Sequence, residues 1–175
     1  MLTLHGKKTY LRALEPEDLD VLYAIENNEE FWEISSTQTP FSKALLKRYL
    51  ENAHRDIYEV KQLRLVICAK DDRILGLIDL FDFDPAHQRV GIGIIIAKKE
   101  DRGKGHGKEA LELICKYCFA RLGLHQVYVN ISEENKESQA LFEGLKFQKV
   151  GLKKDWNRAG GKYKNEILYQ LINVH

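Results

Sequence analysis

The segment that decides the fold runs from Gly91-Ile92-Gly93-Ile94-Ile95-Ile96 through the loop Arg102-Gly103-Lys104-Gly105-His106-Gly107 to a helical pattern. The continuous apolar run is typical of a strand covered on both faces, so we expect it near the centre of a sheet. Apolar residues recur at helical spacing from Lys108 to Leu122, and Gly123 provides a stop. A strand, a glycine-rich turn and a helix start predict an anion site, because glycines let successive N–H groups face one concavity.

The cations and spacing of this loop separate three kinds of phosphate binder. Three cations flank the loop within reach of one anion: Arg102, Lys104 and Lys108. A nucleotide P-loop requires four residues where only three separate Gly103 from Gly107, and Glu109 replaces its magnesium-binding hydroxyl. A dinucleotide fingerprint requires a glycine where Lys108 stands. A charged surface turn remains as an alternative, although such turns rarely join a buried strand to an amphipathic helix.

Hydrophobic periodicity outward from this segment predicts the remaining elements. Strands are expected over 8–14, 63–70, 74–83, 89–97, 125–131, 147–153 and 163–172. Helices are expected from about 16 to 27, then over 42–56, 108–122 and 135–145. With no linker or repeat, the 175 residues predict one α/β domain, residues 1–175, built around a mixed sheet.

Composition restricts the partners and the compartment. Twenty-seven basic against 26 acidic residues give a net charge of +1, which predicts neither a nucleic-acid nor a membrane partner. Cys68, Cys115 and Cys118 lie in apolar stretches, so we expect buried thiols and no metal despite the C-x-x-C spacing of the last two. Met1–Gly6 lacks a targeting pattern and no apolar run approaches ~20 residues, which favours a cytoplasmic protein.

The loop and the segment after it resemble the GCN5-related N-acetyltransferases, the GNAT family. That family's Arg/Gln-x-x-Gly-x-Gly/Ala fingerprint is matched by Arg102, Gly105 and Gly107. Its later Asn-x-x-Ala/Ser, Leu-Tyr and Gly-Phe positions correspond to four residues: Asn135, Ser138, Leu141 and Phe147. The resemblance is strong over Leu63–Val150 and implies a single-domain GNAT-like fold, with a mixed, mostly antiparallel sheet of about seven strands and about four helices.

The same resemblance implies an acetyltransferase with acetyl-CoA as co-substrate. Backbone groups of Ile94, Ile95 and Ile96 would pair with the pantetheine arm, and an amide there would polarise the thioester carbonyl. The pyrophosphate would bind the loop and helix start: Arg102, Gly103, Lys104, Gly105, His106, Gly107 and Lys108. Asn135 would hydrogen-bond the cofactor, and Ser138 belongs to the same motif.

Three further stretches look like the branch that holds spermidine and ribosomal-protein N-terminal acetyltransferases: Asn27-Asn28, Thr39-Pro40-Phe41 and Leu75–Leu80. They imply a primary amine as acceptor, with a polyamine or a polypeptide N-terminus preferred. Asp79 matches an acidic position of that branch, as a base or amine anchor or as a structural acid. The expected partner is therefore a small-molecule or peptide amine, and a homo-oligomer is left open.

The sequence departs from the family at its catalytic positions. Phe142 stands where the family has a tyrosine proton donor, and Gly91 replaces an acidic residue of the central strand. We expect Tyr128, on the neighbouring strand, to be a substitute donor. The departures keep open a catalytically silent acyl-CoA-binding regulatory module, and a nucleotide-dependent oxidoreductase is a weaker third possibility.

An acidic cluster lies at the expected end of the first helix. Glu29, Glu30 and Glu33 follow Glu26 and surround two aromatic residues. Carboxylates beside aromatic rings can bind a polycation, so these three glutamates are candidate acceptor-binding residues. A solvated acidic helix end is the alternative.

Overall fold

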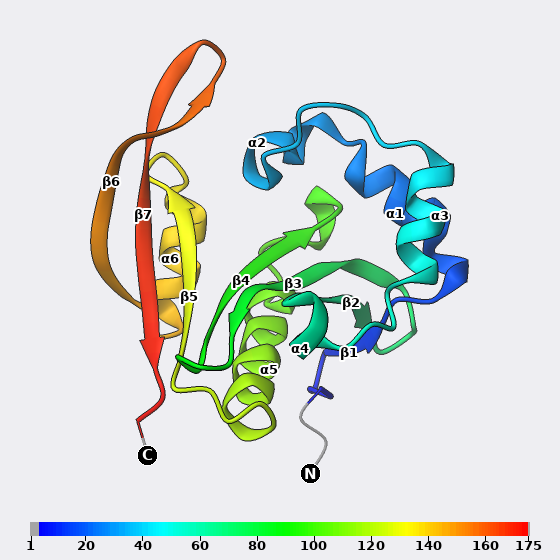
Figure 1. The fold of residues 1–175 in the computed structure, drawn as a ribbon, viewed down its shortest axis with the longest axis horizontal. Coiled ribbons are helices and arrows are strands. Elements are labelled where there is room, and N and C mark those ends of the chain that lie inside the picture. Colours follow the sequence, from blue (N-terminus) through cyan, green and yellow to red (C-terminus); the bar gives the residue numbers. More distant parts are fainter. Residues whose placement is uncertain (1–3, 175) are drawn as a thin grey trace.

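The central apolar strand is the middle strand of a seven-stranded sheet. The computed structural model of the protein describes residues 4–174, so Met1–Thr3 of the stretch considered for targeting lie outside it. The sheet has the order β1-β2-β3-β4-β5-β7-β6 (Figure 1). Its strands are β1 (Thr9–Ala13), β2 (Leu63–Ala69), β3 (Ile74–Asp84), β4 (Arg89–Ile96), β5 (Gln126–Ser132), β6 (Gln148–Ala159) and β7 (Lys162–Ile172). The expected mixed, mostly antiparallel sheet of about seven strands is confirmed.

The one parallel pairing among these strands is also where the sheet opens. β4 pairs with β5 only from Arg89 to Gly91, opposite residues 126–128. Beyond Gly91 the two strands diverge, whereas β4 stays paired with β3 up to Ile96 and β5 stays paired with β7 up to Ser132 (Figure 1). The carboxyl half of β4 therefore has a free edge toward β5.

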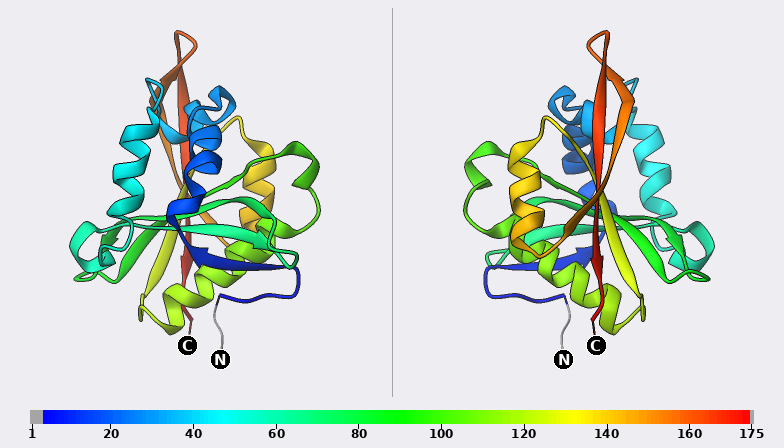
Figure 2. Two further views of the ribbon diagram at one scale, coloured as in Figure 1. Left: turned by 90° about the vertical axis from the view of Figure 1, so that its right-hand side faces the viewer. Right: turned by 90° about the vertical axis from the view of Figure 1, so that its left-hand side faces the viewer.

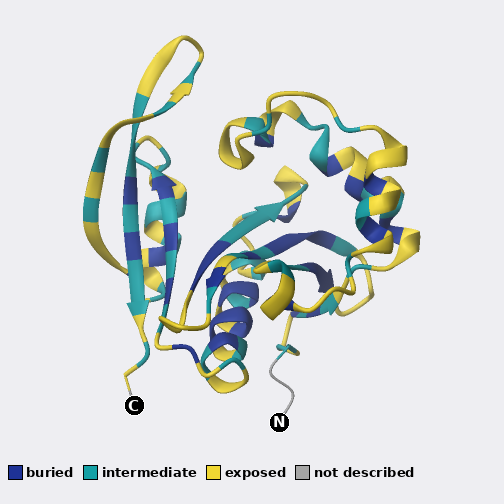
Figure 3. Ribbon diagram, viewed as in Figure 1, coloured by how far each residue is buried: buried dark blue, intermediate teal, exposed yellow. Residues whose placement is uncertain are grey.

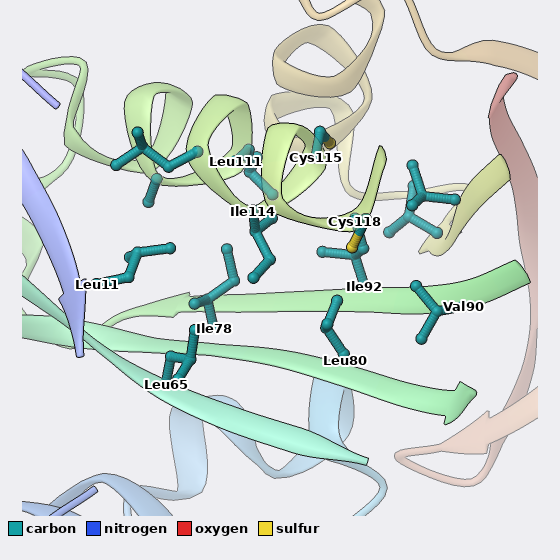
Figure 4. Packing of buried hydrophobic residues seen from close by; sticks show 14 of the residues in the cluster. Leu11, Leu65, Ile78, Leu80, Val90, Ile92, Leu111, Ile114, Cys115 and Cys118 are labelled. Atoms are coloured by element: carbon teal, nitrogen blue, oxygen red, sulfur yellow. The ribbon is translucent and has the colours of Figure 1, made fainter. Parts of the chain in front are cut away.

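Two helical layers cover the sheet. The long helix α5 (His106–Ala120) packs on one face against Ile78, Leu80, Val90 and Ile92, as Figure 4 shows. The other face is covered by α1 (Leu19–Glu26) and α3 (Lys43–Glu51), which lie opposite α5 (Figures 1 and 2). Helix α6 (Lys136–Gly144) packs beside β5 and β7. The strands on both sides of the opening carry buried residues that pack against these helices (Figure 3).

The cysteines belong to this packing. Cys68, Cys115 and Cys118 are free and buried, as expected. Burial raises the pKa of Cys115 to about 12, because a thiolate would lose its hydration there. Such thiols are inert core residues. In residues 4–174 none of the helices is long and apolar enough to cross a bilayer.

The helices are more numerous than predicted, with six α-helices in the described chain. The helix expected over 42–56 ends at Glu51, and a separate turn, α4 (Ile57–Val60), follows. Asp56 starts α4 because its Oδ1 accepts the N–H of Tyr58 at 2.7 Å. A second short helix, α2 (Trp32–Ser35), occupies the acidic cluster, where only a helix end was expected. The described 3₁₀ turns are η1 (Pro16–Asp18), η2 (Glu29–Phe31) and η3 (Lys99–Asp101).

The strand β6 is longer than the sequence indicated, whereas β7 agrees with its prediction to within one residue. β6 continues past Lys153 to Ala159, and the β6–β7 hairpin projects beyond the rest of the sheet with an exposed tip (Figures 1 and 3). The register shifts between Lys153 and Asn157, so β6 bulges in its middle. That bulge interrupts the alternation of apolar residues, which explains why only the first half of β6 was predicted.

Candidate active site

The glycine-rich loop has the backbone geometry of an anion site. Gly103 and Gly105 have φ of +71° and +86°, in the left-handed region that favours glycine. Gly105 caps α5, and the N–H of Glu109 donates to its carbonyl at 3.1 Å. The N–H groups of residues 106–108 precede that bond and have no acceptor within the helix. They are available to phosphate oxygens at the positive end of the helix dipole.

A cleft of about 330 Å³ opens at this loop, which we call the donor cleft. Ten of the twelve residues expected to bind the cofactor line it: Ile94, Ile95, Ile96, Arg102, Gly103, Gly105, Gly107, Lys108, Asn135 and Ser138. Lys104 does not line it, and its carbonyl instead accepts a bond from Lys8 Nζ at 3.0 Å. His106 is also outside the lining, and within residues 4–174 its buried Nδ1 has no hydrogen-bond partner.

The floor of the donor cleft is the free edge of β4. Ile94, Ile95 and Ile96 pair with residues 76–78 of β3 on one side, and the parallel pairing with β5 has already ended on the other. An extended ligand with amide groups can bond such an edge as an added strand would. This arrangement suits the amides of a pantetheine arm.

One end of the donor cleft is formed by the first turn of α6. Asn135 Oδ1 accepts the N–H of Ser138 at 3.1 Å, so this side chain caps the helix. Leu141 lines the cleft one turn further on. Phe142 does not line it: the ring is 2% exposed and meets Phe147 edge-on at 5.1 Å. The position of the family's tyrosine donor is therefore a core position in this chain.

The opposite wall of the donor cleft comes from the acidic cluster and was not predicted. Glu30, Phe31 and Ile34 line the cleft from η2 and α2. Arg102 Nη1 donates to Glu30 Oε1 at 3.0 Å, and the guanidinium lies 5.6 Å from the ring centroid of Phe31. The bond from Arg102 lowers the pKa of Glu30. The glutamate was noticed in the sequence, but its assignment to the acceptor is not supported by this position.

A second cavity, of about 440 Å³, lies between α1, α3 and the β2–β3 hairpin, and we call it the acceptor cavity. Asp79 lines it, together with Glu26 and Arg64. Arg64 donates to both Asp79 oxygens, from Nε at 2.7 Å and Nη2 at 3.0 Å, and from Nη1 to Glu26. Burial opposes the charge of Arg64, yet the two carboxylates outweigh it and raise its pKa.

Arg64 is a site residue that the sequence did not reveal. It pairs directly across the hairpin with Asp79. Counting back from the expected turn at Asp71-Asp72 places these two residues opposite each other. The expected register of the hairpin could therefore have identified Arg64 as the neighbour of Asp79. Glu26 comes from α1, and nothing in its local pattern connects it to β2.

Tyr128 and two of the predicted acids lie outside both cavities. Tyr128 stands opposite Gly91 at the paired end of β4, and its ring meets Phe81 edge-on at 6.0 Å. Burial raises its pKa, and it lines neither cavity. Glu33 is bound by Lys164 of β7 at 2.6 Å, and Glu29 is exposed outside both linings. The structure therefore does not gather Glu29, Glu30 and Glu33 around one acceptor.

The linings of the donor cleft and the acceptor cavity share no residue, but they come to neighbouring positions of the sheet at Gly93. This residue pairs with Asp79, which lines the acceptor cavity, and is followed in β4 by Ile94, which lines the donor cleft. A Cβ added at Gly93 would meet only the Cβ of Asp79, at 4.0 Å. A glycine within a strand commonly marks a place where a ligand comes close to the backbone.

These features define an acyl-group transferase with a nucleotide-phosphate loop, an open strand edge and a second cavity. The chain belongs to the GNAT acetyltransferases, because the Acetyltransferase (GNAT) domain family matches residues 8–148. It is an acetyltransferase, and as in that family acetyl-CoA is its co-substrate.

Known proteins similar to the chain are N-acetyltransferases. N-acetyltransferase p20 of Bacillus licheniformis is 29% identical over 174 residues, covering 98% of this chain and 97% of that protein. The spermidine N(1)-acetyltransferase of Vibrio cholerae is 28% identical over 144 residues, covering 81% and 79%. A crystal structure of the Vibrio cholerae spermidine N-acetyltransferase with CoA and spermine has a TM-score of 0.86 and 24% identity, covering 95% and 96%. That likeness shows the fold.

Proposed function

We propose that the chain transfers the acetyl group of acetyl-CoA to a primary amine in the acceptor cavity, with a polyamine or a polypeptide N-terminus as candidate acceptors. The observation that carries the proposal is that Asp79 of the acceptor cavity and Ile94 of the donor cleft occupy neighbouring positions of the sheet, on either side of Gly93. An amine anchored at Asp79 would face the donor cleft across a position that has no side chain. Bound acetyl-CoA would supply a thioester carbon that an amine can attack.

Different residues of the donor cleft would bind different parts of acetyl-CoA. N–H groups of the loop and helix start, with Arg102 and Lys108, would bind the pyrophosphate. The edge of Ile94–Ile96 that no strand pairs with would bond the pantetheine amides, beside the Ile96 carbonyl that Arg102 already occupies. An N–H on that edge would also stabilise negative charge on the thioester oxygen as attack proceeds.

Asp79 is assigned to anchor the amine. Arg64 donates to both Asp79 oxygens and so holds the carboxylate in one position, from which it can accept a bond from an ammonium group. The ammonium group would lose one proton to water before attack. The nitrogen would then form the C–N bond as the C–S bond breaks, and its excess proton would pass to water or to the departing thiolate. A thiol ionises near pH 8.5, so a thiolate can leave without the tyrosine donor that Phe142 and Tyr128 fail to provide.

Thiol release from acetyl-CoA across a panel of primary amines tests the proposal, with mass spectrometry of the acetylated amine. Asp79→Asn is expected to raise KM for the amine at least tenfold and leave KM for acetyl-CoA unchanged. Asp82→Asn is the matched control, because Asp82 is exposed on the same strand and lines neither cavity. Acetyl-CoA binding without acetylation of any amine would favour the silent module instead.

A further inference from the structure

The acceptor cavity carries fewer free charges than a polycation requires. We propose that it selects a primary amine with one positive charge on an apolar body and discriminates against polyamines. A polypeptide N-terminus with apolar first side chains belongs to this class. The inference rests on the proposed function and narrows its acceptor.

The charged groups of the cavity balance to a single negative charge. Glu26 and Asp79 are its two carboxylates, and Arg64 is its guanidinium. Arg64 bonds both carboxylates, and the side chains of Glu26 and Arg64 are only 13% and 22% exposed. One ammonium group neutralises what remains. A second ammonium on the same ligand would find no counter-charge among the residues that line the cavity.

The remaining wall is largely apolar. Phe41, Leu45, Tyr49, Leu63 and Phe81 line it, beside a few uncharged polar groups such as Thr37. Methylene groups and aromatic rings gain free energy on leaving water for such a wall, whereas an ammonium group loses its hydration there. An alkyl or aromatic body is therefore favoured over a chain with a charge at its far end.

The glutamates that could have received further ammonium groups are used elsewhere. Glu30 pairs with Arg102 and lines the donor cleft, and Glu33 pairs with Lys164 at 2.6 Å. Glu29 lies outside the lining of the acceptor cavity. Of the acidic stretch that would suggest a polyamine in the sequence, Glu26 lines the acceptor cavity, whereas Glu29, Glu30 and Glu33 do not.

The sharpest test compares n-hexylamine with 1,6-diaminohexane, which share one chain and differ by one ammonium group. We expect kcat/KM for n-hexylamine to exceed that for 1,6-diaminohexane at least tenfold, with spermidine no better than the diamine. Equal or higher kcat/KM for the diamine or spermidine would overturn the inference. If no amine in the panel is acetylated, the proposed function itself fails, so the two failures are distinguishable.

Two variants test the origin of the preference. Arg64→Gln leaves two carboxylates without their cation, so the preference for n-hexylamine should fall at least threefold. Leu45→Ser should lower kcat/KM for n-hexylamine several-fold more than that for ethylamine, because the longer chain has more apolar surface to bury against the wall that Leu45 helps to form. Leu45 is 47% exposed, so this variant should fold even where Arg64→Gln does not. Leu152→Ser, at a 40% exposed position outside the cavity, is the control and should change neither amine. An unchanged chain-length dependence in Leu45→Ser would contradict the inference.

Discussion

Arg102 and Glu30 form an ion pair inside the donor cleft, with Nη1 and Oε1 3.0 Å apart. Arg102 also donates to the carbonyl of Ile96 from Nε and Nη2, at 3.2 and 3.1 Å. The first residue of the acetyl-CoA fingerprint is thus held against the end of β4, and a carboxylate shares its positive charge. An anionic ligand entering the cleft meets this glutamate beside its own binding cation.

Removing that carboxylate should strengthen cofactor binding. We expect Glu30→Gln to lower the Kd of acetyl-CoA by about three- to tenfold at low salt, because a negative charge near the phosphates is lost. The gain should shrink as salt is added. Calorimetric titration measures both, and Glu29→Gln serves as the control because Glu29 lies outside the cleft. Weaker binding in Glu30→Gln would show that Glu30 positions Arg102 rather than opposing the ligand.

The glycine at the start of α5 should be irreplaceable by a branched residue. Gly105→Val places a Cβ 3.2 Å from Lys8 Nζ and forces a φ near +86° that β-branched residues avoid. The loop must shift, and its N–H groups no longer converge. We expect acetyl-CoA binding to weaken more than tenfold, with about 1.4 kcal/mol for each decade.

Titration calorimetry of Gly105→Val measures this loss. Gly144→Ala is the comparison, since no atom lies within 4 Å of its added Cβ and its φ is not positive. Wild-type affinity in Gly105→Val would reject the assignment of the loop to the cofactor.

The loop was predictable because its information is contiguous. Gly103, Gly105 and the helix start lie within a few residues, and their backbone requirements are local. The floor of the donor cleft was also predictable, since a continuous apolar run places Ile94–Ile96 in a central strand. Both features depend only on spacing along the chain, which the sequence displays directly.

The acceptor side was not predictable in the same way. Glu26 and Arg64 are 38 residues apart, and only the packing of α1 over β2 brings them together. The sequence did not indicate that Glu30 lines the donor cleft, because a helical pattern does not give the direction of a side chain once the chain turns through η2 and α2. The resemblance to the family identified Phe142 as the position of the tyrosine donor. It could not show that this side chain points into the core, because that depends on how α6 packs against Phe147.

Glu109 should make the stability of the protein depend on pH. Its carboxylate accepts bonds from Thr9 Oγ1 at 2.7 Å and from the N–H groups of residues 7–9. Burial opposes the charge, but these bonds outweigh it and hold the pKa of Glu109 below its ordinary value. The stabilisation is therefore present above the ordinary pKa of a glutamate and is lost as the pH falls through the lowered value.

Glu109→Gln should lower the free energy of unfolding by about 1–3 kcal/mol at pH 7, because an amide cannot accept all of these bonds. The difference in the free energy of unfolding between variant and wild type should become smaller toward pH 3. Denaturant titrations at both pH values measure it, with Glu112→Gln as the control at an exposed position of the same helix. A gap that is the same at both pH values would mean that the charge of Glu109 contributes nothing.

A substitution at Gly93 should slow turnover without weakening the binding of acetyl-CoA. Val is well suited to a strand, and the first added atom at Gly93 would meet only the Cβ of Asp79 at 4.0 Å, so Gly93→Val should fold normally. Its side chain would lie beside Asp79, where the amine is proposed to be anchored. We expect kcat to fall at least tenfold while the Kd of acetyl-CoA stays within about twofold, since transfer needs close approach of amine and thioester.

The neighbouring glycine provides the contrast. Gly91 lies two residues earlier in β4, and a Cβ there would meet the ring of Phe81 at 2.4 Å. Gly91→Val should therefore lower the melting temperature, whereas Gly93→Val should not, because overpacking a filled site is destabilising. Thermal unfolding, calorimetry and initial rates on both variants distinguish the cases. If Gly93→Val weakens acetyl-CoA binding as much as it slows turnover, Gly93 lies within the donor cleft, and the amine reaches the thioester by another path.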